Sequence, residues 1–380
     1  MALLWPHALA AGSQPGSKYG VVTRQGRPRM VVPLDSPRAA AAAINRMSSD
    51  VGAGSGLVRR LGGYGLRSGL MQPFLRTRWT SPCEGTPPSL EDYFREALGV
   101  DELALAVTVG PRRPNRKPVI ELLTPHGETI AFAKAGWNGL TRHLVAQEAA
   151  NLNGLDRAAM PNIEPPKVLH HGNHGELDIL VLSPLAQPQQ ANVRRAPTAH
   201  EVGQVAILAT SPDQRLEASP YAVALRGRTT PRSKADAALV DRALEQARRG
   251  DGEAPMRFGG WHGDWTPWNM LATQSRLLVW DWERAGGPVP LGLDVIHYWF
   301  QSAWLREGAS AEVAIDIALD RSAEVFIALG VPGIHRHSLG LLYLSELFLR
   351  YAENADYGTD QLRAGRHDEV RGALRQLIRD

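Results

Sequence analysis

The segment WHGDWTPWNMLATQSRLLVWDWE, residues 261–283, contains five tryptophans and three acidic residues. It predicts a loop followed by a β-hairpin, with NMLAT and LLVWDW as the strands and Gln274-Ser275 at the turn. The first residue of one strand and the last residue of its antiparallel partner lie close together, so Asn269 and Asp281 are expected to meet at the open end of the hairpin. Both side chains offer the oxygen ligands that Mg²⁺ bound to a nucleotide requires.

Asp264 lies on the loop that precedes the hairpin, five residues before Asn269. In this position it is expected to stand beside the metal ligands, where a carboxylate can accept a proton from an attacking hydroxyl. An isolated aspartate in a loop is usually a cap or a turn residue. The ordered set of Asp264, Asn269 and Asp281 favours a site over that simpler interpretation.

The tryptophans of the segment are first expected to fill space between the hairpin and the helices around it, because large aromatic side chains usually pack in a core. The alternative is an aromatic pocket for a cationic substrate. Trp265 and Trp268, on the loop beside Asp264, are the two residues for which that alternative is open.

The pattern resembles the aminoglycoside phosphotransferase and choline kinase-like family, the small-molecule relatives of protein kinases. The resemblance is carried by His262-Gly263-Asp264 with Asn269 five residues after the aspartate, and by Asp281, which is similar to the metal-binding aspartate of kinases. Gly263 stands where protein kinases carry arginine, as in the small-molecule branch. The resemblance implies that Asp264 is the catalytic base, that Asn269 and Asp281 hold Mg²⁺, and that His262 only supports the loop.

An upstream part of the chain matches the same family. Lys134 ends a predicted strand and Glu148 lies in the helix that follows, where kinases hold the lysine that contacts the α- and β-phosphates and the glutamate that orients it. The segment LVLSPL, residues 180–185, occupies the place of the connection between the lobes. The resemblance therefore implies Lys134, Glu148, Val181 and Ser183 as nucleotide-binding residues, with ATP or GTP as the phosphoryl donor.

Two further residues acquire expected roles from the resemblance. Asp294, in LGLDVIHYW, is expected to begin a helix and to tie the catalytic loop in place. His297, three residues later, is expected to pack and not to act as a ligand.

The segment GPRRPNRK, residues 110–117, departs from the family pattern, because a single glycine cannot supply the run of backbone donors of a glycine-rich phosphate loop. Arginine side chains or the backbone of residues 113–116 are expected to contact the phosphates instead. The alternative to an enzyme is a degenerate kinase-fold protein that binds nucleotide and serves as a scaffold or regulator. The intact Lys134, Asp264, Asn269 and Asp281 favour the enzyme.

Strand and helix patterns around these motifs predict an α+β, two-lobed protein kinase-like fold. Three strand patterns within residues 102–135, a helical pattern at 140–155 and two strand patterns within 167–185 predict a five-stranded antiparallel N-lobe with one helix. Helical periodicity dominates after residue 284, which predicts a mainly helical C-lobe. We predict an N-terminal α/β accessory unit of unknown role over residues 1–95, the N-lobe over 96–185 and the C-lobe over 186–380.

Composition agrees with a globular enzyme of two or three domains in a chain of 380 residues. A formal net charge of +3 gives only a weak bias toward anionic ligands, and no run of like charges predicts a nucleic-acid partner. The single cysteine, Cys83, predicts no internal disulfide, and no apolar stretch predicts a membrane span. These features predict a cytoplasmic protein, and the resemblance implies a small-molecule acceptor. The sequence encodes neither the identity of that acceptor nor the oligomeric state.

Overall fold

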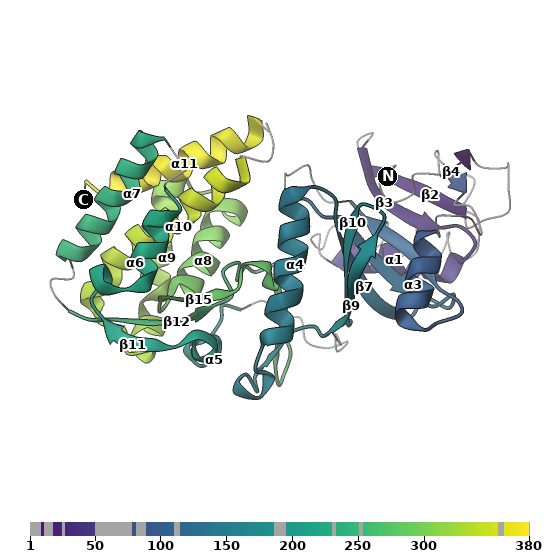
Figure 1. Cartoon of the computed structure of the whole chain (residues 1–380), viewed down its shortest axis with the longest axis horizontal. Coiled ribbons are helices and arrows are strands. Elements are labelled where there is room, and N and C mark those ends of the chain that lie inside the picture. The colour runs from purple at the N-terminus through teal and green to yellow at the C-terminus, as the bar shows by residue number, and fades with distance from the viewer. Residues whose placement is uncertain are drawn as a thin grey trace. The chain divides into compact units, whose positions relative to one another are not determined.

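The computed structural model describes residues 9–10, 18–24, 27–49, 78–80, 89–109, 115–185, 195–229, 233–250, 254–355 and 361–379. The chain forms two compact units (Figure 1). Unit 1 comprises Met1–Ala149 and Pro166–Pro184, and unit 2 comprises Ala150–Pro165 and Leu185–Asp380. The last boundary between the units lies between Pro184 and Leu185, and residues 150–165 belong to unit 2.

Unit 1 is built on one antiparallel sheet, which within the described residues has nine strands in the order β1-β4-β2-β3-β5-β6-β7-β10-β9. The strands are β1 (Leu9–Ala10), β2 (Lys18–Arg24), β3 (Arg27–Pro33), β4 (Arg78–Thr80), β5 (Ala104–Thr108), β6 (Val119–Leu123), β7 (Thr129–Gly136), β9 (Val168–His174) and β10 (Leu177–Leu182). Helix α4 (Gly139–Gly154) follows β7. The predicted five strands with one helix after the third are therefore confirmed as β5, β6, β7, β9 and β10 with α4.

Side chains alternate between the two faces of this sheet, and each face is covered by a helix. Helix α3 (Leu90–Leu98), whose N-cap is Ser89, packs Phe94 against a core that includes Val107 and Ile120. Helix α1 (Pro37–Ser49) packs its alanines against Met30 and other residues in a separate core cluster. Strands β5, β6 and β10 are thus buried on both sides, which explains why they are almost continuously apolar.

The described part of residues 1–95 joins the same sheet. Strand β3 pairs with β5, with Met30 opposite Thr108 and Val31 opposite Val107. The sheet is therefore larger than the five strands that the sequence predicted. The sequence pattern also predicts a hairpin turn at Gly26 and a Pro/Gly/Ser-rich joint at residues 81–88, and both lie outside the described residues. The accessory role of the N-terminal segment stays a prediction.

Unit 2 is mainly helical, as predicted. Its helices in the described residues are α5 (Ala199–Ala206), α6 (Pro220–Gly227), α7 (Lys234–Gly250), α8 (Leu293–Gln301), α9 (Ala311–Ala328), α10 (Arg336–Ala355) and α11 (Gln361–Leu377). The apolar faces of α6, α7, α8, α9, α10 and α11 form one core, in which Phe300 and Phe348 are fully buried. The α+β prediction is confirmed by the sheet of unit 1 and the helices of unit 2.

Two small sheets contain parts of the segment formed by residues 261–283. One contains β11 (Ser211–Gln214), β12 (Met256–Trp261) and β15 (Gly286–Pro290), and the other contains β8 (Ile163–Glu164), β13 (Met270–Ala272) and β14 (Leu277–Val279). The hairpin β13–β14 is the predicted one. Strand β12 was not predicted, because its glycines are poor strand formers. Gly260 is required by packing: a β-carbon there would lie 2.7 Å from the carbonyl oxygen of Val205 in α5.

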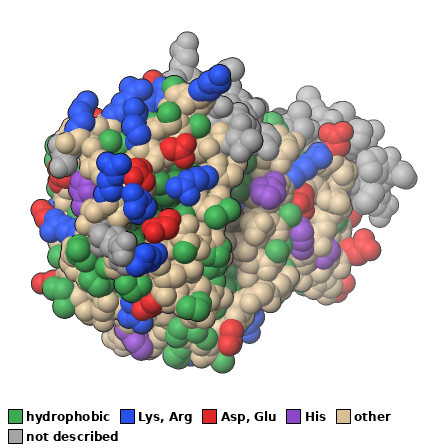
Figure 2. Space-filling view, turned by 60° about the vertical axis from the view of Figure 1, so that its left-hand side comes forward, with side chains coloured by type: hydrophobic (Ala, Val, Ile, Leu, Met, Phe, Trp, Pro, Cys, Tyr) green, Lys and Arg blue, Asp and Glu red, His purple; other side chains and the backbone are tan. Residues whose placement is uncertain are grey.

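The visible surface of the helical unit carries basic and acidic side chains next to one another (Figure 2). Within this unit, ion pairs join Arg321 to Glu307 and Arg371 to Asp236. In the described residues, no helix combines the length and the apolar character needed to cross a bilayer.

Candidate active site

The predicted lysine and glutamate of unit 1 form a buried ion pair. Lys134 Nζ lies 2.7 Å from Glu148 Oε1 and 2.6 Å from Oε2. Lys134 is in β7, where its buried neighbours Ala133 and Ala135 belong to the α3-side core, so the lysine side chain projects to the opposite face. Glu148, in α4, is completely buried. The structure thus brings together two residues that the sequence places 14 positions apart.

Val181 and Ser183 occupy different environments at the end of β10. Val181 is buried inside the sheet, opposite Ala133 of β7 on one side and His170 of β9 on the other. Ser183 follows the strand, and its backbone N–H donates to the Lys167 carbonyl at 2.8 Å while its hydroxyl accepts from the Lys167 N–H at 2.9 Å. Val181 is therefore paired within β10, whereas Ser183 lies after the end of this strand.

Asp264 and Asn269 of unit 2 contact each other directly. Asn269 Nδ2 donates to the Asp264 carbonyl at 3.0 Å and to Asp264 Oδ2 at 2.8 Å. The Asn269 carbonyl accepts from the backbone N–H of Trp280, which holds the loop against the far strand of the hairpin. Because both side-chain bonds come from the amide nitrogen, the amide oxygen of Asn269 is retained as a ligand for a hard cation.

Asp281 follows β14 at the open end of the hairpin, next to Trp280. It is the single non-glycine residue with positive φ in the described part of the chain, at φ 65°. This left-handed conformation is uncommon for residues other than glycine and is often found at functional sites. Asn151 Nδ2 stabilises the segment that follows by donating to the carbonyls of Trp282 at 2.8 Å and Ala285 at 3.0 Å. The hairpin therefore brings Asp281 to the same end as Asn269, as predicted.

The carboxylate of Asp264 is held in its ionised form. Its partial burial by itself raises the pKa. The hydrogen bond from His297 and the charge of Arg350 outweigh this effect and lower the pKa of Asp264 to about 2. His297 Nε2 lies 3.1 Å from Asp264 Oδ1, and its Nδ1 lies 3.0 Å from the Tyr343 hydroxyl. Burial lowers the pKa of His297, so the neutral ring donates from Nε2 and accepts from Tyr343.

His297 is the functional neighbour that sequence reasoning missed, since it was expected only to pack. Asp294 and His297 are three residues apart on α8, a spacing that places them on one face of a helix. With Asp294 already expected to contact the catalytic loop, that spacing was the available signal for His297.

His262 and Asp294 stabilise the loop that carries Asp264, as predicted. Asp294 accepts from the backbone N–H groups of His262 at 2.7 Å and Gly263 at 2.9 Å. His262 is fully buried, and burial lowers its pKa to about 4, so it stays neutral and donates to the Trp280 carbonyl. Its Nδ1 accepts from the Asp264 N–H at 3.2 Å. These bonds fix the backbone that presents Asp264.

Gly263 has φ 79°, and a β-carbon there would lie 2.4 Å from the Arg284 carbonyl oxygen. We expect Gly263→Ala to lower the free energy of unfolding by at least about 2 kcal/mol, because it combines an unfavourable backbone conformation with a steric overlap. Thermal unfolding of the full chain measures this effect. Gly227→Ala, at a helical position with open space around it, is the matched control. Equal melting temperatures for the two variants would contradict the steric explanation.

The tryptophans divide between the core and the surface. Trp265 and Trp282 are completely buried, whereas Trp268 is 38% exposed. The guanidinium of Arg350 lies 5.5 Å from the ring centre of Trp261. Core packing therefore explains Trp265 and Trp282. Of the two tryptophans considered for substrate contact, Trp265 is excluded by its burial, and Trp268 is retained as a candidate.

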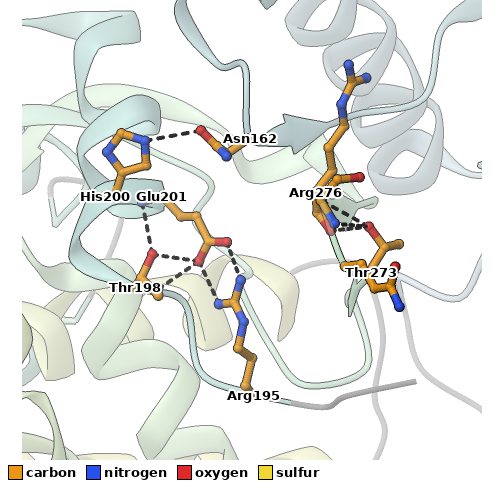
Figure 3. Close-up of a pocket in the computed structure, with 9 residues that line it drawn as sticks. Asn162, Arg195, Thr198, His200, Glu201, Thr273 and Arg276 are labelled. Atoms are coloured by element: carbon orange, nitrogen blue, oxygen red, sulfur yellow. Dashed lines mark hydrogen bonds and ion pairs between the residues drawn. The ribbon is translucent and has the colours of Figure 1, made fainter. Parts of the chain in front are cut away.

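A polar pocket of about 250 Å³ lies at the opposite end of the hairpin, around its turn (Figure 3). Several of its polar groups already have partners: Arg195 pairs with Glu201, His200 contacts Asn162, and Arg276 pairs with Glu164 outside the pocket. It is lined by Asn162, Arg195, Thr198, His200, Glu201, Thr273, Gln274, Ser275 and Arg276. None of the predicted site residues lines it, so we do not assign the catalytic chemistry to this pocket.

The predicted phosphate-contacting segment is only partly described. Residues 110–114 lie outside the described residues, so the expected contacts of residues 113–116 are untested there. Among the residues that the structure does describe, no group of three or more His, Cys, Asp or Glu side chains is arranged to hold a metal ion.

No family model and no curated protein sequence matches the chain. The chain is similar in structure to the aminoglycoside phosphotransferase APH(4)-Ia in complex with ADP and hygromycin B, with 14% identity, a TM-score of 0.46 and coverage of 75% of this chain and 97% of that chain. It is also similar to a putative fructosamine-3-kinase from Haemophilus somnus, with 12% identity, a TM-score of 0.45 and coverage of 75% and 96%.

The amicoumacin kinase hAmiN, in complex with AMP-PNP, Ca²⁺ and its substrate, gives 11% identity, a TM-score of 0.43 and coverage of 71% and 88%. At these identities and scores we base the functional proposal on the geometry of the chain's own residues. The solved structures to which the chain is similar are small-molecule kinases, the group that the sequence resemblance predicted.

Proposed function

We propose that the chain is an ATP-dependent phosphotransferase that moves the γ-phosphoryl group to a hydroxyl of a small molecule, which is aminoglycoside-, choline- or sugar-like. The observation that carries the proposal is the arrangement in unit 2: an ionised Asp264 is hydrogen-bonded to Asn269, and Asp281 lies at the same end of the hairpin. A base beside two oxygen ligands is the arrangement that phosphoryl transfer uses.

In the proposed reaction Asp264 accepts the proton of the acceptor hydroxyl. The hydroxyl oxygen forms a bond to the γ-phosphorus as the bond from that phosphorus to the β,γ-bridging oxygen breaks, and ADP leaves. The transition state of such a transfer is loose, so orientation of the hydroxyl is a larger part of the catalysis than strong basicity. A carboxylate with a pKa of about 2, held by His297 and Asn269, fits that orienting role.

Asn269 and Asp281 would hold Mg²⁺ through an amide oxygen and a carboxylate. Two protein ligands suit Mg²⁺, which usually completes its octahedron with phosphate oxygens and water. When bound, the ion neutralises charge on the β- and γ-phosphates. The left-handed backbone of Asp281 supports this role, because strain of that kind is retained where function requires a particular direction of the side chain.

Lys134 is the proposed contact to the α- and β-phosphates, and Glu148 holds its ammonium group in place. For the adenine, Ser183 is the proposed contact through its backbone carbonyl, since its N–H is bonded to Lys167. Val181, which is paired on both sides within the sheet, is proposed to support this segment by packing. The donor is proposed to be ATP, with GTP as the alternative.

The first experiment is a calorimetric titration of Mg·ATP and of Mg·GTP into the full chain, each repeated with the metal removed by a chelator. We expect binding that depends on the metal, followed by phosphoryl transfer when hydroxyl compounds are screened as acceptors. A folded chain that binds neither nucleotide would contradict the proposal. That result would favour the alternative of a scaffold or regulator, and would direct attention to residues 110–117.

The proposal includes a small-molecule acceptor and a cytoplasmic location, and it involves neither nucleic acid nor membrane as partner. Residues 1–95 are proposed as an accessory segment of unit 1. Limited proteolysis near residues 81–88, with and without Mg·ATP, would report whether that segment is separable and whether nucleotide protects it.

A further inference from the structure

Arg350 places a largely buried positive charge beside the proposed base. Its side chain is 12% exposed, and its Nη1 lies 3.9 Å from Asp264 Oδ1, beyond hydrogen-bonding distance. Asp264 is its only ion-pair partner within the described residues. The guanidinium lies over the ring of Trp261, which positions it without neutralising it.

Asp264 is already committed to other donors. His297 donates to its Oδ1, and Asn269 donates to its Oδ2. The nearby acids on α10 are also engaged: Arg228 pairs with Glu346 and, at 2.7 Å, with Glu353. Each of these carboxylates therefore has other partners, and none of them pairs with Arg350 alone.

A second arginine increases the positive potential at this place. The Arg284 guanidinium donates to Asn354 Oδ1 at 3.1 Å. Burial lowers the pKa of Arg284, and the charge of Arg350 lowers it further, whereas the charges of Glu283, Asp264 and Glu353 raise it. An anion bound beside the two arginines would relieve the repulsion between them.

It is unfavourable to bury an arginine without a hydrogen-bonded counter-ion, and the planar guanidinium matches the geometry of carboxylate and phosphate groups. We propose that Arg350 binds a carboxylate or phosphate group of the acceptor, so that the acceptor is an anionic hydroxyl compound. This inference rests on the proposed function, because it takes Asp264 as the place where the acceptor hydroxyl binds.

The two oxygens of Asp264 indicate which substrate Arg350 contacts. Asn269, a proposed metal ligand, bonds Oδ2, whereas His297 and Arg350 approach Oδ1. The phosphates of the donor belong with the metal ligands, so the Oδ1 side is left for the acceptor. Polycationic acceptors such as aminoglycosides are disfavoured there, because Arg284 and Arg350 would repel their ammonium groups.

The test uses three two-carbon hydroxyl compounds that differ mainly in charge: glycolate, ethylene glycol and ethanolamine. Their binding to the full chain, without nucleotide and at constant ionic strength, is followed by the shift of the thermal unfolding midpoint. We expect glycolate to bind the wild type about tenfold more tightly than ethanolamine, as a charge-assisted contact to arginine predicts. Arg350→Met is expected to remove the preference, and Arg350→Lys to retain part of it.

Arg276→Met is the matched control, because Arg276 is 55% exposed and lies at the turn of the hairpin. The inference is overturned if ethylene glycol or ethanolamine binds the wild type as tightly as glycolate, or if Arg350→Met, shown to be folded by circular dichroism, still prefers glycolate. It is also overturned if inorganic phosphate binds through Arg350 only when Mg·ADP is present while glycolate does not bind, since Arg350 would then contact the transferred phosphoryl group.

Failure of this inference and failure of the proposed function give different results. If Mg·ATP does not bind but glycolate binds through Arg350, the oxyanion site stands and the phosphotransferase proposal fails. If Mg·ATP binds and is turned over while glycolate shows no preference, the phosphotransferase proposal stands and the acceptor is not anionic.

Discussion

Asp264→Asn is expected to lower phosphoryl transfer by about 10²–10⁴-fold without weakening the binding of Mg·ATP, the range usual for loss of a positioned general base. Asparagine has the same shape, so its side-chain oxygen can still accept from Asn269. It cannot accept the proton of the acceptor hydroxyl. The loss should therefore appear in turnover and leave nucleotide affinity in place.

Turnover by the wild type, by Asp264→Asn and by Asp241→Asn measures this effect. Asp241 is exposed on α7 and lies 3.7 Å from Arg226, so its substitution changes the same chemical group away from the site. Full turnover by Asp264→Asn would remove Asp264 from the reaction. Equal losses in both variants would point to a general effect of the lost charge.

The pH dependence of the wild type follows from the same contacts. The pKa of Asp264 is depressed from 3.8 to about 2, so this group contributes stability that is present above the unfolded value and is lost as the pH falls through the folded one. We expect no loss of turnover that is due to Asp264 between about pH 5 and 8. A fall in this range would have to come from another group.

Asp281→Ala is the second substitution with a large expected effect: Mg²⁺-dependent nucleotide binding and turnover should both be lost. A carboxylate supplies a charged ligand that alanine cannot replace. The outcome differs from that of Asp264→Asn, in which binding is retained. Calorimetric titration of Mg·ATP into the variant is the measurement, and wild-type affinity would contradict the assignment.

Asp281→Gly separates the metal role from the backbone role. Asp281 has φ 65°, a conformation that costs a residue with a β-carbon about 1 kcal/mol or more relative to glycine. Asp281→Gly should therefore be more stable than Asp281→Ala by about 1 kcal/mol, although both lack the carboxylate and neither binds Mg·ATP. Equal stability would show that the left-handed backbone is not a source of strain.

Local elements of the fold were predictable because they depend on neighbouring residues. Ser89 and Gly99 bound α3 as a helix cap and a left-handed C-terminal residue, respectively. The hairpin was evident from its two short apolar runs and the polar turn between them. Strand β12 was not predictable, since glycine has a low strand propensity and Gly260 is present only because α5 packs closely on it.

The sequence by itself determined the order of the proposed site residues along the chain, which is Lys134, Glu148, Asp264, Asn269 and Asp281. Their spacings suit a strand followed by a helix, and a loop followed by a hairpin. The tertiary structure alone decided the surroundings of the base. His297 lies 33 residues from Asp264, and Arg350 comes from α10, still further along the chain. For His297 the sequence signal is its three-residue spacing from Asp294 on α8. The contact of Arg350 depends on how α8 and α10 pack in the helical core, and this packing leaves no local pattern in the sequence.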